Sequence, residues 1–229
     1  SQIDDHISII IEEGVKIVFT SAGNPAKWTS HLKAHNITVV HVVSNVKFAK
    51  KAVDAGVDAI VAEGFEAGGH NGIEETTTMC LIPLIRKTVS LPLIAAGGIG
   101  SGASMLAAMA LGADGVQIGS RFIASTESSA HQNFKNYILN SKEGETQLIL
   151  KEITPVRLLK NEFYNQIISA YDRGASKEEL VALLGRGRAK KGMFLGDLKD
   201  GELEVGQISA TMDTIKPASD IVKEIIEEL

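Results

Sequence analysis

The residues best suited to chemistry lie in one loop, residues 61–72, where a single histidine stands among four glycines. An imidazole with its ordinary pKa of about 6.5 can take up and release a proton near neutral pH. Glycine lets a backbone approach a ligand closely. Because the loop follows an apolar run at residues 58–62, we expect His70 to act as a base beside a flat ligand. Glu66, four residues earlier, would favour the charged imidazole if the two side chains converge.

The other histidines and the lone cysteine are expected to have structural or surface roles. Cys80 stands between apolar residues in a helical pattern, which predicts a thiol packed in the core. A single cysteine also excludes an intrachain disulfide and suits a reducing compartment. We expect no metal site in this chain. The histidines without a chemical assignment are His6, His31, His35, His41 and His131.

Two further glycine-rich segments are suited to holding an anion. Residues 93–100 read as an apolar strand that runs into Gly97 and Gly98, and residues 115–121 end a second strand with glycine, serine and arginine. In a (β/α)8 barrel, the loops after the last two strands commonly bind phosphate through backbone N–H groups. The pair therefore predicts a phosphorylated cofactor. A dinucleotide-binding fingerprint is rejected, because the glycine spacing is wrong and the acidic residue about twenty positions on is missing.

Strands and helices alternate along the part of the chain that positions these loops. Five apolar runs without alternation are typical of parallel strands that are covered on both faces. Glycines at 14, 56 and 112 are expected to end three helices before the next strand, and Ser44 and Ser101 to cap the second and third of them. This repeat predicts a parallel sheet or a barrel. The strands are expected at residues 15–20, 38–43, 58–62, 92–96 and 115–119.

Composition narrows the class of protein. The chain has 229 residues, of which 44% are hydrophobic, and this is enough for an α/β domain with a full core. A net charge of −5 argues against a nucleic-acid surface, and the basic residues Arg186, Arg188, Lys190 and Lys191 read as a solvated loop. No membrane-spanning run or signal peptide is visible, so we expect a cytoplasmic protein without membrane or nucleic-acid partners. A monomer and a homo-oligomer are both left open.

The glycine motifs together resemble one known family. The segments Glu-Ala-Gly-Gly-His-Asn-Gly, Ala-Ala-Gly-Gly-Ile and Gln-Ile-Gly-Ser-Arg-Phe are similar, in order and spacing, to those of the nitronate monooxygenases and the related flavin-dependent type II enoyl-acyl-carrier-protein reductases. This resemblance implies an FMN-binding TIM-type (β/α)8 barrel, in which His70 is the catalytic residue. It implies flavin-binding positions at Glu63, Gly68, Gly69, Gly97, Gly98, Gln117, Ile118, Gly119 and Ser120.

The resemblance also implies a division of the chain. If the last two expected strands are the seventh and eighth, then residues 15–20 form the fourth, and the first three barrel strands are expected to be absent from this sequence. Residues 1–125 would form five βα units of the FMN-binding barrel. Residues 126–229 would form a helical region over the barrel mouth. Within it, helices are expected at residues 127–141, from 161 onwards, at 177–184 and at 221–229, with an irregular or extended segment at 148–159.

Three functions follow from the resemblance, and the first two act on a small-molecule substrate. A nitronate monooxygenase would oxidise alkyl nitronates with dioxygen, with His70 as base or as electrostatic partner of the nitronate. A type II enoyl reductase would require NAD(P)H; Glu63, which is glutamine in many nitronate monooxygenases, and residues 196–208 are similar to the reductases. The insertion that precedes Thr76 departs from the reductase pattern, so nitronate oxidation is favoured. The third alternative is a flavin-binding protein without turnover, against which the intact His70 argues.

Overall fold

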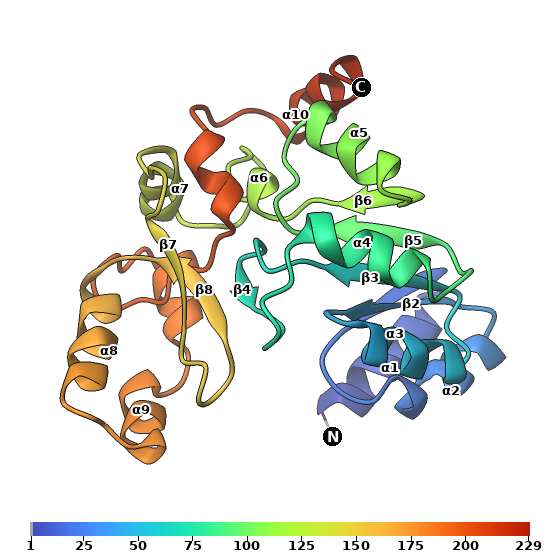
Figure 1. Ribbon diagram of the computed structural model, residues 1–229, viewed down its shortest axis with the longest axis horizontal. Helices are drawn as coiled ribbons and strands as arrows, with labels where there is room; N and C mark the ends of the chain where they lie inside the picture. The colour runs from blue at the N-terminus through green and yellow to red at the C-terminus, as the bar shows by residue number, and fades with distance from the viewer. Residues whose placement is uncertain (1) are drawn as a thin grey trace.

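A five-stranded parallel sheet forms the first part of the computed structural model, which describes residues 2–229 (Figure 1). The strands pair in the order β1-β2-β3-β5-β6, so neighbours in the sheet are also successive along the chain once β4 is set aside. All pairs in this sheet are parallel, as the sequence predicts. The bounds are Ile17–Thr20 (β1), Thr38–Val43 (β2), Ala59–Glu63 (β3), Leu93–Ala96 (β5) and Gly115–Gln117 (β6). This is the α/β architecture of a TIM-type barrel, with five of its strands among the described residues.

Helices precede and connect the strands, and three of them end as predicted. Gly14, Gly56 and Gly112 have φ values of 65°, 80° and 109°, in the left-handed region that glycine adopts without strain at a helix C-terminus. These helices and the other two are α1 (Gln2–Glu12), α2 (Thr29–Ala34, after the 3-10 turn η1, Pro25–Lys27), α3 (Val46–Asp54), α4 (Thr78–Arg86) and α5 (Gly102–Ala110).

The two predicted N-caps have different outcomes. Ser101 caps α5, since its hydroxyl accepts a hydrogen bond from the backbone N–H of Ser104 at 3.2 Å. The prediction for Ser44 is wrong, because Asn45 caps α3 instead. The Asn45 side-chain oxygen accepts from the N–H of Phe48 at 2.7 Å, so the helix begins one residue later than expected. Serine and asparagine are both good caps, and pattern alone does not choose between neighbours.

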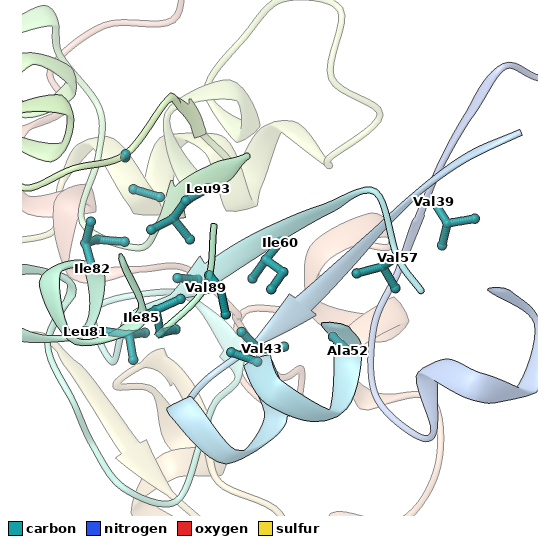
Figure 2. Packing of buried hydrophobic residues seen from close by; sticks show 14 of the residues in the cluster. Val39, Val43, Ala52, Val57, Ile60, Leu81, Ile82, Ile85, Val89 and Leu93 are labelled. Carbon is teal, nitrogen blue, oxygen red and sulfur yellow. The ribbon is translucent and has the colours of Figure 1, made fainter. Parts of the chain in front are cut away.

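The main core lies between the sheet and its helices, as Figure 2 shows. Ile60 of β3 and Leu93 of β5 are fully buried there, and each such side chain stabilises the fold by roughly 1.5–3 kcal/mol. Helix α4 turns Leu81, Ile82 and Ile85 towards this core. Cys80 lies on the opposite face of α4 and is exposed, so the prediction of a packed thiol is wrong.

The region after the sheet contains helices and a β-hairpin, so it is less purely helical than predicted. The helix expected at 127–141 begins only at Gln132, and the segment expected to be irregular or extended is the hairpin of β7 and β8. The elements are α6 (Ser120–Ile123), α7 (Gln132–Leu139), β7 (Thr146–Ile149), β8 (Val156–Leu159), α8 (Glu162–Asp172), α9 (Lys177–Leu184), the π-helical turn η2 (Lys190–Phe194), the 3-10 turn η3 (Gln207–Thr211) and α10 (Ala218–Glu227).

A second, antiparallel sheet joins this region to the loop that carries the histidine. Its order is β4-β8-β7, and β4 is the two-residue strand Gly69–His70. Figure 1 shows β4 between the parallel sheet and the C-terminal region. Helix α10 packs against α5, where the Glu228 carboxylate that follows α10 accepts from the N–H of Gly102 at 2.8 Å.

The basic segment after α9 is more ordered than a solvated loop. The Arg188 guanidinium donates to the carbonyls of Leu183, Leu184 and Asp200 and stacks over Phe163, with 4.3 Å from Cζ to the ring centroid. Its hydrogen bonds are therefore used within the fold. Among residues 2–229, no helix combines the length and the apolar character that a membrane crossing needs.

Candidate functional site

His70 lies on β4, where it is held at the edge of the hairpin. It pairs with Val156 of β8, and the N–H of Asn71 donates to the Pro155 carbonyl at 2.9 Å. Gly69, immediately before it, has a φ of 76°, a conformation that side chains rarely adopt. The imidazole is exposed rather than packed in a core. The imidazole is therefore accessible to a ligand, and its role as a base stays a prediction.

Arg157 fixes the loop that leads to His70. It is the largest of the fully buried side chains, at 2% exposure, and its Nε and Nη2 donate to the Phe65 carbonyl at 3.1 and 3.0 Å. Its guanidinium also lies 4.4 Å from the centroid of the Phe65 ring. Burial lowers the pKa of Arg157, and the nearby carboxylates of Glu66 and Glu75 counter that effect. A buried charge needs such partners, so Arg157 ties residues 65–70 to β8.

Glu66 does not converge with His70, so its expected influence on the imidazole is corrected. Its carboxylate caps α4, where it accepts from the Thr78 backbone N–H at 2.9 Å and lies 3.0 Å from the Thr78 hydroxyl. That hydroxyl is also 2.8 Å from the Gly97 carbonyl. Because a helix N-terminus favours negative charge, the carboxylate is well placed there. Thr78 thus connects the loop after β3 with the loop after β5.

The predicted cofactor positions gather around one cavity of about 290 Å³ at the C-terminal ends of the strands. We call it the glycine cavity. It receives residues from the loops after β3, β5 and β6 and from the segment Glu204–Ile208 of the C-terminal region. Seven of the nine predicted positions line it, namely Glu63, Gly68, Gly97, Gly98, Gln117, Gly119 and Ser120.

The remaining two predicted positions do not line the glycine cavity. The Ile118 side chain packs against the main core. Gly69 is buried against Glu204, whose carboxylate oxygen would lie 2.8 Å from a Cβ at that position. The glycine at position 68 is explained by packing as well, since a Cβ there would lie 2.4 Å from the Val205 carbonyl carbon.

Backbone donors at two strand ends remain available to an anion. Within residues 2–229, the N–H groups of Gly98 and Gly119 make no backbone hydrogen bond, and a Cβ at Gly119 would meet no atom within 4 Å. Gly98 has a φ of 70°. The Ser120 hydroxyl accepts from the N–H of Gly206 at 2.8 Å, which joins the C-terminal segment to the cavity wall. Free amides at adjacent strand ends suit the oxygens of a phosphate.

Glu63 connects the glycine cavity to a second one. The second cavity has a volume of about 440 Å³ and is lined by Glu63, His70 and Asn71 among others; we call it the histidine cavity. Glu63 ends β3, and burial raises its pKa to about 7. A carboxyl group with this pKa can hold or release a proton near neutral pH.

The histidine cavity is also lined by His41, for which the sequence predicted only a structural or surface role. His41 of β2 is 5% exposed, and its Nδ1 lies 2.7 Å from the Thr20 hydroxyl. Burial lowers the pKa of His41, and Lys51 on α3 lowers it further. The side chains of His41 and Lys51 both line the histidine cavity. The available sequence signal was an imidazole near the C-terminal end of an otherwise apolar strand.

Two glutamates near His70 also received no role in the sequence analysis. Glu202 and Glu204 border, with His70, a smaller cavity of about 200 Å³. The sequence signal that could have indicated them is the alternation Glu-Leu-Glu-Val. In an extended segment, alternate side chains point to opposite faces, so the buried Leu203 and Val205 lie on one face and the two carboxylates on the other. No group of three or more side chains among the described residues is arranged to hold a metal ion.

Comparisons with known proteins show the family to which the chain belongs. A family model described as nitronate monooxygenase matches residues 1–228. A probable nitronate monooxygenase of Staphylococcus aureus (strain Newman) is 34% identical over 235 residues, which cover 98% of this chain and 65% of that protein. The chain therefore belongs to the nitronate monooxygenase family, and it spans about two thirds of the length of this relative.

Solved structures of two enzymes share the fold. FabK from Thermotoga maritima is similar with a TM-score of 0.91 and 37% identity, over 98% of this chain and 71% of that one. A nitroalkane oxidase from Streptomyces ansochromogenes gives a TM-score of 0.80 and 26% identity, over 99% of this chain and 67% of that one. The predicted family and the TIM-type fold are both confirmed.

Proposed function

We propose that this protein is an FMN-dependent oxidoreductase that oxidises alkyl nitronates with dioxygen. The observation that carries the proposal is the junction at Glu63, where the glycine cavity with its free amide donors meets the cavity that contains His70. A family model and a curated relative with the nitronate monooxygenase name support the same function.

The residues around the glycine cavity fit a phosphorylated flavin. The N–H groups of Gly98 and Gly119, with the wall at Ser120, would hold the phosphate, because they are unpaired donors at the ends of adjacent strands. The glycines allow an approach that a side chain would block. When bound, FMN would accept electrons from the substrate and pass them to dioxygen.

His70 would handle the proton or the negative charge of the substrate. With a nitroalkane, an imidazole nitrogen would take the proton from the α-carbon, and the C–H electron pair would remain on the substrate as nitronate. With a nitronate, the protonated ring would pair with the anion. Lys51 adds a positive charge to the same cavity. The neutral His41 would offer a hydrogen bond without adding charge.

One observation favours a second candidate, an NAD(P)H-dependent type II enoyl reductase. FabK, an enoyl-acyl-carrier-protein reductase of type II, is 37% identical, against 26% for the nitroalkane oxidase. The carboxyl group of Glu63 at the cavity junction also agrees with the reductase-like glutamate expected from the sequence. In this reading His70 would stabilise the enolate that forms after hydride transfer.

A comparison of two assays on the purified, FMN-loaded protein tests the proposal. We expect oxygen uptake with propionate 3-nitronate and no NAD(P)H oxidation that depends on a crotonyl thioester. Thioester-dependent NAD(P)H oxidation without nitronate turnover would replace the proposed function with the reductase. Absence of both activities in a protein with full flavin absorbance would leave a binding protein without turnover.

A further inference from the structure

The edge of β8 brings a carboxylate to His70. Strand β7 occupies one edge of β8 along its whole length, so partners outside β7 lie on the opposite edge. On that edge, Gly69 and His70 pair with Arg157 and Val156, and Glu204 forms the next bridge, with Leu158. Along this edge, the partners of Val156, Arg157 and Leu158 are therefore His70, Gly69 and Glu204 in turn. Glu204 lies next to Gly69, although His70 and Glu204 are 134 positions apart in the chain.

The Glu204 side chain is directed to this junction. One of its carboxylate oxygens would lie 2.8 Å from a Cβ at Gly69, the residue before His70. Glu204 lines the glycine cavity and also borders the smaller cavity that His70 shares. It is thus placed between the proposed flavin site and the imidazole.

We propose that Glu204 is the positioning residue of His70, whose carboxylate pairs with the imidazolium that forms when His70 takes a proton from the substrate. The proton moves from the substrate α-carbon to the imidazole, the electron pair stays on the substrate, and Glu204 remains ionised and unprotonated throughout. A neutral imidazole thereby becomes one half of an ion pair, which favours the proton transfer. This role depends on the proposed function only for the identity of the substrate.

The charges around Glu204 agree with this pairing. Burial raises the pKa of Glu204, and the charge of His70 lowers it, so the charged forms of the two groups favour each other. Other charged or titratable groups on the packed elements include Glu202, which borders the same cavity, Glu63 of β3, across the glycine cavity, and the buried Arg157 of β8, which donates to the Phe65 carbonyl. Arg188 acts on Glu202, which also feels the charge of Glu204.

The test measures the coupling directly, by 13C NMR titration of the glutamate carboxyl groups, with the Glu204 signal assigned from its loss in Glu204→Gln. We expect His70→Gln to raise the Glu204 midpoint by about one pH unit, because the positive neighbour is lost. The control His6→Gln changes an exposed histidine on α1 and should leave the midpoint unchanged. An unchanged midpoint in folded His70→Gln would overturn the pairing.

Kinetics then test the consequence. Glu204→Gln should keep its flavin, lower kcat about 10- to 100-fold and change KM less than about threefold, since the carboxylate acts through the imidazole and not on the bound substrate. Glu143→Gln, at an exposed position before β7 that lines none of these cavities, is the matched control, and its kcat should change less than about threefold. Normal kcat in Glu204→Gln would overturn the positioning role even if the NMR coupling is present. A wild-type protein without turnover would refute the proposed function, while the NMR result would still decide the pairing.

Discussion

At the scale of single residues, the site depends on groups whose surroundings differ from what their types suggest. His70 is exposed on a two-residue strand, whereas Glu63 is largely buried at the boundary of two cavities. Glu66, the acidic residue closest before His70 in sequence, caps a helix, whereas Glu74, equally far after it, lines the histidine cavity. Distance in sequence therefore does not decide which carboxylates lie near the imidazole.

The first prediction concerns His70. We expect His70→Ala to fold and retain FMN but to lose nitronate turnover by at least about a hundredfold, since a positioned base contributes about 10²–10⁴-fold. Stopped-flow and steady-state oxygen uptake measure the loss, and flavin absorbance checks retention. His6→Ala, on the exposed face of α1, is the control. Near-normal turnover in flavin-loaded His70→Ala would remove the histidine from the mechanism, and loss of folding would make it structural.

The second prediction uses the carboxyl group of Glu63, whose pKa burial raises from 4.5 to about 7. Because the folded protein holds this proton more tightly, its contribution to stability is complete below pH 4.5 and is lost as the pH rises through 7. The wild type should therefore lose free energy of unfolding between pH 4.5 and pH 8, whereas Glu63→Gln has no carboxyl group to titrate. The free energy of unfolding of Glu63→Gln minus that of the wild type should be more positive at pH 8 than at pH 4.5, by on the order of 2 kcal/mol.

Urea unfolding of the flavin-free protein at both pH values measures this difference. Glu13→Gln replaces an exposed glutamate after α1 and should change little between the two pH values. An equal free energy difference between Glu63→Gln and wild type at both pH values would mean that Glu63 titrates normally.

At the scale of elements, one side chain and one short strand determine where the histidine loop lies. β4 pairs with β8 over only two residues, which is too short to be stable by itself. Arg157 on β8 adds two hydrogen bonds to the Phe65 carbonyl and the stacking on the Phe65 ring. The loop therefore depends on a hairpin far from it in sequence.

The third prediction follows from that dependence. Arg157→Met keeps an apolar stem but leaves the Phe65 carbonyl without its donors, so we expect a loss of about 1–3 kcal/mol in the free energy of unfolding. Urea denaturation measures the change, and Arg173→Met, at an exposed position after α8, is the matched control. Equal stability of Arg157→Met and Arg173→Met would show that the loop does not depend on this guanidinium.

At the scale of the whole molecule, the local patterns predicted the parallel sheet but not the partners that complete the site. Continuous apolar runs and helix-ending glycines determine the parallel strands β1, β2, β3, β5 and β6 and their connections within about 30 residues of sequence, so these elements could be predicted. The contacts of Glu204, Gly206 and Arg157 with the loop before α4 and the start of α6 join segments 86 or more positions apart. Composition and periodicity do not encode such pairings, and for this reason the placement of these residues at the site could not be predicted.

The burial of single side chains could not be predicted from the sequence either. Cys80 and Leu81 are neighbours in one apolar run, yet only Leu81 faces the core, because the direction of α4 depends on how it packs against the sheet. In the same way, seven of the predicted cofactor positions line the glycine cavity, while Ile118 turns inwards to the core. Motifs locate a loop, and packing decides which of its residues face the ligand.

The central claim is that FMN binds in the glycine cavity, and flavin content after replacement of Gly98 tests it most directly. Gly98→Val places a branched side chain at a φ of 70° with its Cβ 3.3 Å from the Glu66 Cβ, which strains the turn that holds one of the free amide donors, and we expect the purified variant to lose its flavin absorbance and not to regain it with added FMN. Gly144→Val is the matched control, since Gly144 has a φ of 77° with no atom near its Cβ and does not line the cavity. It should bind FMN like the wild type. Full flavin occupancy in folded Gly98→Val would contradict the claim and place the phosphate elsewhere.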